Sequence, residues 1–333
     1  MGAVADYFSR LSHGFAAGWN RFWFTPSDPY PLGVIRLLTG LVALWLQATL
    51  LPDVVRFFAA AGWIPVDVVQ RSTLRGYPLS YLNLVSSPGA LLVVHCLGLA
   101  VLVLFTIGFW TRLTSVLALV VVLSNIHRAP MITTQVEPVL TMVLLYLCLG
   151  PAGASWSIDR LRSRRTAFAA AALGTQTGLP PASYSATLSL RLIQVHLAML
   201  CATMGMAKLM GEVWWSGMGA WWLATRPESR LADLTAMPRY LVNLWTHVIV
   251  AFELGFPILI WVRLARPLLL GIAVAVWLSL AVLTGQVTFA LMMLIASLSY
   301  CSPAWLRSCG ENCCRRSAAA PLSTVQLSPA PLR

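Results

Sequence analysis

The sequence predicts an all-α protein, a polytopic transmembrane helical bundle with about eight membrane helices and an N-terminal interfacial helix. Three observations support this prediction. Only 10% of the 333 residues are charged, whereas a soluble domain carries about 25%. The mean hydropathy is +0.76. Apolar stretches that come close to the roughly 20 residues of a membrane helix recur along the chain.

Residues 1–25 are predicted to form an amphipathic helix that lies on the membrane surface. Polar residues fill one face of this segment, and aromatic anchors opposite a polar face are typical of interfacial helices. The turn 26–29, with two prolines, ends the helix. Its apolar residues recur at steps of three and four: Phe8, Leu11, Phe15, Trp19 and Phe22.

Residues 26–305 form the predicted transmembrane domain. Three of its apolar stretches are short, so we expect them either to be buried in the bundle or to thin the bilayer locally. The two long loops, at about 52–89 and 211–240, are rich in aromatic residues and are expected to fold back onto the membrane surface. The eight apolar stretches are 31–51, 90–110, 113–126, 136–149, 188–210, 241–262, 267–284 and 287–300.

Basic residues predict the orientation and the partners. An arginine cluster at 160–165 follows the fourth apolar stretch directly, and basic residues near helix ends favour the cytoplasmic side. We therefore expect a multi-pass protein of the cell inner (plasma) membrane, with both termini cytoplasmic. The formal net charge is +12, but apart from such clusters the basic residues are scattered singly between apolar runs. The lipid membrane is thus the expected partner, and no nucleic acid is expected.

The C-terminal segment 306–333 is predicted to be a disordered cytoplasmic tail, because its end is small, polar and proline-containing. It contains Cys309, Cys313 and Cys314. This juxtamembrane cluster is either a palmitoylation site or an incidental group of reduced thiols. No group of His, Cys, Asp and Glu has the spacing of a metal site, so no metal is expected.

Ionisable side chains within the apolar stretches are the candidates for a functional site, because inserting each one costs roughly 2.5–3.5 kcal/mol. Lys208 is the only lysine in the sequence. Gln194 lies 14 residues earlier, near the same face of the fifth helix. A desolvated lysine can act as a base, and the alternative is that Lys208 snorkels to the outer interface.

Further polar residues occur in the neighbouring stretches. His247 and Asn243 are four residues apart on the sixth helix, where they form either part of a site or an ordinary interhelical hydrogen bond. Glu253 lies deeper and is expected to pair with an arginine or to stay neutral. His196 and Arg36 are the remaining candidates that we assign to ligand binding.

Several short motifs recur in an order that is similar to a known family. They are WNRFWF at 19–24, PLGVIR at 31–36, GFWTR at 108–112, HRAP at 127–130, Gly150–Pro151, WSIDRL at 156–161, AKL at 207–209 with Trp214, Trp215 and Gly217, and Thr288–Phe289. Together they resemble the HTTM domain, the membrane domain of vitamin K-dependent gamma-carboxylases. The resemblance covers about Trp19 to Trp305.

The resemblance implies a multi-helix membrane domain and a specific role for one residue. In the carboxylases, a lysine in the motif that matches 207–209 deprotonates vitamin K hydroquinone, so Lys208 would be the catalytic base. The implied cofactor is a reduced prenylated quinone of the vitamin K type. The sequence departs from the pattern at Ala207, where the carboxylases have a second lysine, and at Trp277, where many members have a histidine.

Two classes of function remain open at this point. The first is a quinol-oxidising, carboxylase-like (lyase) membrane enzyme with Lys208 as base. Gln194, His196, His247 and Arg36 would bind its substrate, under a lid of Trp214, Trp215, Trp221 and Trp222. The second is a non-catalytic scaffold or accessory protein whose partner is a membrane protein or a secreted peptide. The two are distinguished by whether Lys208 faces a pocket or the lipid headgroups.

Overall fold

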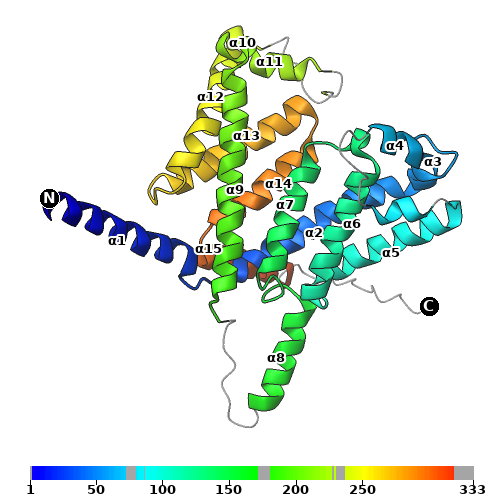
Figure 1. Cartoon of the computed structure of the whole chain (residues 1–333), viewed down its shortest axis with the longest axis horizontal. Helices are drawn as coiled ribbons and strands as arrows, with labels where there is room; N and C mark the ends of the chain where they lie inside the picture. The colour runs from blue at the N-terminus through cyan, green and yellow to red at the C-terminus, as the bar shows by residue number, and fades with distance from the viewer. Residues whose placement is uncertain are drawn as a thin grey trace, which may run out of the picture.

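The computed structural model confirms the all-α prediction (Figure 1). It describes residues 2–72, 80–85, 87–171, 181–226, 229 and 237–318. A helix covers all or most of each of the eight predicted apolar stretches: α2 (Tyr30–Leu50), α5 (Pro88–Ile107), α6 (Thr111–Arg128), α7 (Val136–Leu149), α9 (Tyr184–Leu209), α12 (Arg239–Leu259), α13 (Arg266–Thr284) and α14 (Val287–Ser297).

The chain is a multi-pass membrane protein. Five of the described helical segments are long and apolar enough to cross a membrane, namely 30–58, which begins with α2, and helices α5, α9, α12 and α13. A sixth span arises if α14 with η4 (Leu298–Tyr300) and the start of α15 (Pro303–Ala318) are counted together, although they are bent by 117°. Helix α7 is shorter, and α6 ends in His127 and Arg128. Some of the eight predicted stretches, such as those of α6 and α7, therefore form helices of the bundle that lack the length or apolarity of a full membrane span.

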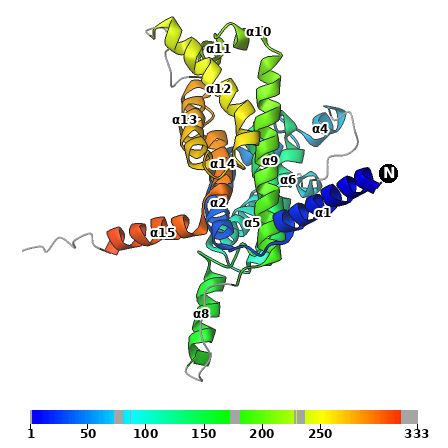
Figure 2. The same ribbon diagram turned by 90° about the vertical axis from the view of Figure 1, so that its left-hand side faces the viewer.

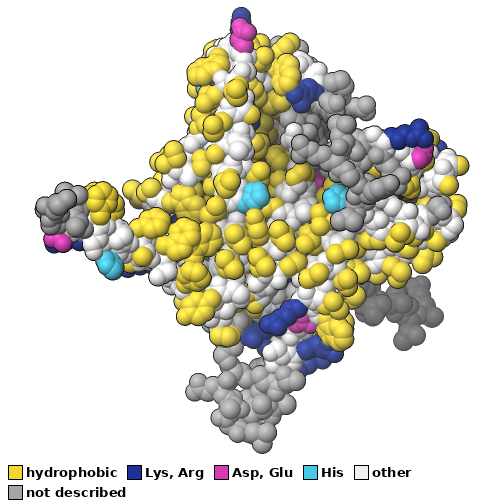
Figure 3. All heavy atoms as spheres, in the orientation of Figure 1, with side chains coloured by type: hydrophobic (Ala, Val, Ile, Leu, Met, Phe, Trp, Pro, Cys, Tyr) yellow, Lys and Arg dark blue, Asp and Glu magenta, His cyan; other side chains and the backbone are white. Residues whose placement is uncertain are grey.

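The bundle packs around α9, which contacts α12, α7 and α14. Its main core is almost wholly aliphatic and aromatic, and Trp277 on α13 is its largest fully buried side chain. Large apolar side chains such as Leu97, Met199 and Ile258 are exposed on the flanks, and Figure 3 shows this apolar surface over the body of the bundle. Such a surface suits lipid tails rather than water.

The long loops contain short helices. After α2 the chain forms η1 (Leu51–Asp53), α3 (Val54–Phe58), α4 (Val66–Ser72) and η2 (Tyr81–Leu84). The last three of these form a small core with Leu91 of α5 and Ala129. Arg128, at the end of α6, is fully buried beside this core and donates from Nη2 to the carbonyls of Phe58 and Ile64, at 3.0 and 2.8 Å. The second long loop forms α10 (Glu212–Trp215) and α11 (Gly219–Ala224), and η3 (Pro130–Ile132) joins α6 to α7.

Three helices project from the bundle: α1 (Gly2–Phe24), α8 (Ile158–Ala171) and α15 (Figures 1 and 2). Phe8, Leu11, Phe15 and Trp19 of α1 are all exposed, which fits the predicted interfacial helix. The prediction of a disordered tail from residue 306 is wrong for its first part, because α15 continues to Ala318. The remaining tail, 319–333, lies outside the described residues.

Candidate functional site

Lys208 and Glu253 form a buried ion pair between α9 and α12. The Nζ of Lys208 donates to both carboxylate oxygens of Glu253, at 2.7 and 2.6 Å. The Glu253 side chain is 0% exposed and that of Lys208 is 13% exposed. The predicted arginine partner of Glu253 is therefore wrong, because its partner is Lys208, while the alternative of a neutral Glu253 remains a prediction. The Lys208 ammonium points into the bundle and not out to the membrane surface.

Close packing of the two helices makes this pair possible. Gly205, one turn before Lys208, lies against Glu253 and Leu254. A Cβ at this position would lie 2.9 Å from the Leu254 side chain, so a larger residue would push α12 away from α9. The lack of a side chain at Gly205 thus brings the Glu253 carboxylate within reach of the lysine.

A cavity of about 540 Å³ lies on the other side of Lys208. Its volume is in the range of small-molecule sites, which is about 300–1,000 Å³. Of the described residues that line it, most are apolar, and the polar ones include Lys208, Arg226 and Gln286. Glu253 does not line it, so Lys208 stands between the cavity and the carboxylate. The apolar lining residues are Pro138, Val139, Leu200, Met204, Ala207, Leu223, Leu280, Phe289 and Met293. We call this cavity the Lys208 pocket.

Two of the four tryptophans predicted to form a lid line the Lys208 pocket. The ring centroid of Trp214 is 5.1 Å from Lys208 Nζ, a cation–π contact. Trp222 also lines the pocket, and the Arg226 guanidinium lies 4.1 Å from its ring centroid. Trp215 instead donates from Nε1 to the carbonyl of Leu209 at 2.6 Å and is 65% exposed. Trp221 is not among the described lining residues.

The structure does not bring the predicted ligand-binding residues to Lys208. Gln194 donates to the Ser299 carbonyl at 2.6 Å and accepts from Arg191 at 2.9 Å. A shift of 14 residues along a helix is about 21 Å, so sharing a face with Lys208 does not place Gln194 in the same pocket. It belongs to a hydrogen-bonded group near the opposite end of the bundle.

The two candidate histidines also lie apart from the Lys208 pocket. His196 Nδ1 is 2.8 Å from the Tyr146 hydroxyl. His247 is exposed and its Nδ1 is 2.8 Å from the carbonyl of Asn243, on its own helix. The polar contact between α9 and α12 is formed by the Lys208–Glu253 pair instead. The assignment of ligand-binding roles to these histidines remains a prediction.

Arg36 lies at the other end of the protein, where α2, α5 and α8 meet. It is 0% exposed, and its Nη2 donates to the Trp156 carbonyl at 2.5 Å. Its Nε and Nη1 have no hydrogen-bond partner among the described residues. Trp156 has a φ of 52°, in the left-handed region that an L-residue adopts at a cost. Arg36 therefore holds a strained segment and does not approach the Lys208 pocket.

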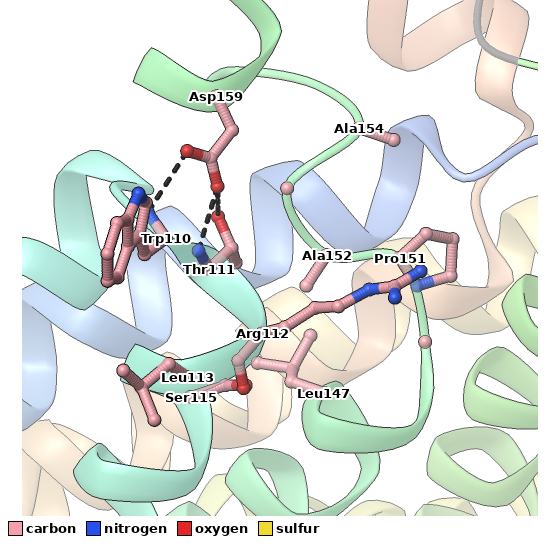
Figure 4. Close-up of a pocket in the computed structure, with 12 residues that line it drawn as sticks. Trp110, Thr111, Arg112, Leu113, Ser115, Leu147, Pro151, Ala152, Ala154 and Asp159 are labelled. Carbon is pink, nitrogen blue, oxygen red and sulfur yellow. Dashed lines mark hydrogen bonds between the residues drawn. The ribbon is translucent and has the colours of Figure 1, made fainter.

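Asp159 is a feature of this end that the sequence analysis missed. Its carboxylate accepts from the backbone N–H of Trp110 at 3.0 Å, and from the N–H and hydroxyl of Thr111 at 2.8 and 2.7 Å (Figure 4). Burial acts to raise the pKa of Asp159, but these hydrogen bonds and the Arg36 charge lower it overall. Asp159 thus caps the first turn of α6, beside a cavity of about 500 Å³.

A signal for this contact was present in the sequence. Asp159 belongs to the motif at 156–161, and its two hydrogen-bond partners belong to the motif at 108–112. The sequence does not show that the two motifs touch. Within the described part of the chain, no group of three or more His, Cys, Asp and Glu could hold a metal ion.

Comparison of the chain with protein-family models, curated proteins and solved structures finds no match. The resemblance to the HTTM domain therefore remains a prediction from the motifs.

Proposed function

We propose that this protein is an HTTM-type integral membrane enzyme with carboxylase-like, quinol-oxidising chemistry. In this proposal it takes a reduced prenylated quinone into the Lys208 pocket and removes a hydroxyl proton with Lys208. One observation carries the proposal. Lys208 is part of the wall of an amphipathic cavity of about 540 Å³ and is backed by the buried carboxylate of Glu253.

The composition of the pocket suits an amphipathic ligand. Leu200, Met204 and Met293 are among the apolar residues that would contact a prenyl chain, while Arg226 supplies positive charge and the Lys208–Glu253 pair gains it on accepting a proton. A quinol that loses a proton becomes an anion, and positive charge in a low-dielectric site stabilises such an anion strongly. The same groups give no comparable advantage to a neutral apolar ligand.

The ion pair gives Lys208 a route for the proton. The pair contains two groups that can bind a proton, the lysine amine and the glutamate carboxylate, and they share one such proton. When a quinol hydroxyl donates to this pair, the added proton leaves Lys208 as ammonium and Glu253 as neutral acid. The pair then has a single positive charge beside the quinolate. Lys208 would be the catalytic residue, and Glu253 would position it and accept the proton.

We further propose that the arginine-rich end of the bundle is cytoplasmic in the plasma membrane. Arg160, Arg162, Arg164 and Arg165 belong to α8, and Figure 1 shows α8 projecting from the end opposite α10 and α11. Basic residues near helix ends favour the cytoplasmic side. The Lys208 pocket, next to α10 and α11, would then open on the outer half of the membrane.

A scaffold function is the alternative, and the same ion pair favours it. Both carboxylate oxygens of Glu253 already accept from Lys208, so the pair also serves as a tie between α9 and α12. In that case the protein would be an accessory subunit for a membrane protein or a secreted peptide. The Lys208 pocket would then bind no quinol.

Quinol turnover by the purified protein tests the enzyme proposal. The balanced reaction is quinol plus dioxygen giving quinone epoxide plus water, measured by chromatography for several prenylated quinols. We expect product from the wild type, and at least a hundredfold less from Lys208→Met, as for loss of a general base. Arg239→Met is the matched control, because it also replaces one cation by methionine, at an exposed position of α12 that is not among the described residues lining the pocket, and it should retain wild-type turnover.

The outcomes separate the two functions. Equal turnover by the wild type and by folded Lys208→Met would remove Lys208 from the chemistry. A folded wild type that neither binds nor oxidises any of the quinols would overturn the enzyme proposal and leave the scaffold. Folding of each variant is checked by its thermal unfolding in detergent.

A further inference from the structure

A second cavity, of about 700 Å³, lies at the arginine-rich end of the bundle. It is formed where the start of α2, the segment 154–158, the start of α8 and α15 come together. Its polar lining includes Tyr30, Trp156, Arg160, Arg164 and Arg307. We call it the arginine pocket. It does not overlap the Lys208 pocket, which lies near α10 and α11, so the nature of its ligand is independent of the proposed function.

Three arginines converge on the arginine pocket. Arg160 and Arg164 are four residues apart on α8 and share a face of that helix. Burial, and then the charge of Arg164, lower the pKa of Arg160, as expected when like charges are brought together. Arg307 comes from α15 and pairs with Asp28. Among the described lining residues Glu311 is the one acidic side chain, so the pocket has an excess of positive charge.

One wall of the arginine pocket is aromatic and firmly held. Trp156 donates from Nε1 to the Tyr30 hydroxyl at 2.8 Å, and the Arg307 guanidinium lies 5.0 Å from the centroid of the Tyr30 ring. The left-handed backbone of Trp156 is fixed by the buried Arg36 at its carbonyl. Strain of this kind persists where the surroundings fix it, and it clusters at binding sites. The wall is therefore preformed before any ligand enters.

The position of the arginine pocket shows at which level of the membrane a ligand in it would lie. Tyr30 is the first residue of α2, and Ile107 is the last residue of α5, and both line the pocket. Both helices are long and apolar enough to span the membrane. The pocket therefore lies where the hydrocarbon core gives way to the headgroups. Figure 3 shows basic side chains gathered where the apolar body of the protein ends, next to α8.

We infer that the arginine pocket binds the phosphate headgroup of an anionic phospholipid. Arginine matches phosphate oxygens with two parallel donors, and basic pockets between membrane helices bind anionic headgroups. Ile107, Leu161 and the Trp156 ring offer apolar contact to the glycerol and upper acyl chains. A soluble phosphate could use the arginines but not these apolar contacts, so a lipid is the favoured occupant.

Lipid binding to the purified full-length protein tests the inference. The protein is extracted in detergent, phosphatidylglycerol or phosphatidylcholine is added, and bound lipid is counted by native mass spectrometry. We expect the wild type to retain phosphatidylglycerol in preference to phosphatidylcholine. Arg160→Gln/Arg164→Gln should weaken phosphatidylglycerol binding about 30-fold, from a surface contribution of roughly fivefold per arginine.

The matched control removes the same number of positive charges outside the pocket. Arg165 and Arg263 are exposed and are not among the described residues that line the pocket, so Arg165→Gln/Arg263→Gln should bind phosphatidylglycerol as the wild type does. Equal weakening in both double variants would mean that general surface charge attracts the lipid, and would overturn the inference. So would the absence of any preference for phosphatidylglycerol.

Two further measurements complete the test. Inorganic phosphate and glycerol 3-phosphate are added as competitors, and displacement of the lipid at equal concentration would assign the pocket to a soluble phosphate. If the double variant does not fold, Arg164→Glu is compared with Arg165→Glu, because both side chains are exposed on α8. The inference requires that only Arg164→Glu loses the lipid.

Discussion

Glu253 accepts hydrogen bonds from Lys208 on both of its carboxylate oxygens, at 2.7 and 2.6 Å, across the packing surface of α9 and α12. This pairs the only lysine of the sequence with an acidic residue deep in a membrane helix. Each charge alone would be expensive in the interior, but together they neutralise each other. The pair therefore combines a structural tie with a proton-accepting group beside a pocket.

We predict that Glu253→Gln destabilises the protein by about 3 kcal/mol, because removal of one member of a buried pair leaves the other charge uncompensated. The measurement is the free energy of unfolding in a titration with a denaturing detergent. Lys208→Met/Glu253→Met should recover most of this loss, since it removes both charges and restores apolar contact. A double variant as unstable as the sum of the two single variants would show that the charges do not interact.

The membrane helices were predictable from the sequence, because backbone groups in lipid must be satisfied within the helix and apolar length alone marks such segments. The pairing of Lys208 with Glu253 was not. Residue spacing gives the angle around one helix, but it does not give the depth at which two helices cross. Gln194 shows the difference, since it shares a face with Lys208 yet lies about 21 Å away along α9.

Arg36→Gln should loosen the segment that contains Trp156. The Arg36 guanidinium donates to the Trp156 carbonyl, and a hydrogen bond from a charged group contributes about 1.5–3 kcal/mol. We expect amide hydrogen exchange of residues 153–160 to become at least about tenfold faster. Arg112→Gln is the control, because Arg112 is exposed at the same end. Unchanged exchange in Arg36→Gln would show that Trp156 is held by other contacts.

The role of Arg36 also shows what the sequence could not provide. A buried arginine in a membrane helix indicates a site or a structural partner. Its partner is the backbone carbonyl of Trp156, 120 residues away along the chain. Every residue carries such a carbonyl. No pattern of side chains could have identified it. The same holds for Arg128, which is held by the carbonyls of Phe58 and Ile64.

Asp159 should make the free energy of unfolding of the protein depend on pH under acidic conditions. The pKa of Asp159 is lowered in the folded protein, and the unfolded value is about 3.9. Its stabilisation is therefore complete above the unfolded pKa and is lost as the pH falls through the folded pKa, below about 4.

Asp159→Asn tests this assignment. At pH 7 the variant should be less stable by about 1–2 kcal/mol, at the lower end for charged hydrogen bonds because the carboxylate is partly exposed. Its free energy of unfolding should fall less steeply than that of the wild type below pH 4. Unfolding is followed by circular dichroism at several pH values. Parallel curves for the two proteins would assign the acid dependence to other carboxylates.

Gly40 on α2 permits the close approach of the membrane helices α2 and α5. A Cβ at Gly40 would lie 3.0 Å from the Thr106 Cα of α5 and would meet its hydroxyl, so Gly40→Ala forces the two helices apart and should cost about 1–3 kcal/mol. Gly271 on α13 has nothing within 4 Å of the same position. Gly271→Ala should therefore stabilise the helix, by up to about 1 kcal/mol. Detergent-induced unfolding of the two variants measures both effects, and a Gly40→Ala protein as stable as the wild type would contradict the close approach of α2 and α5.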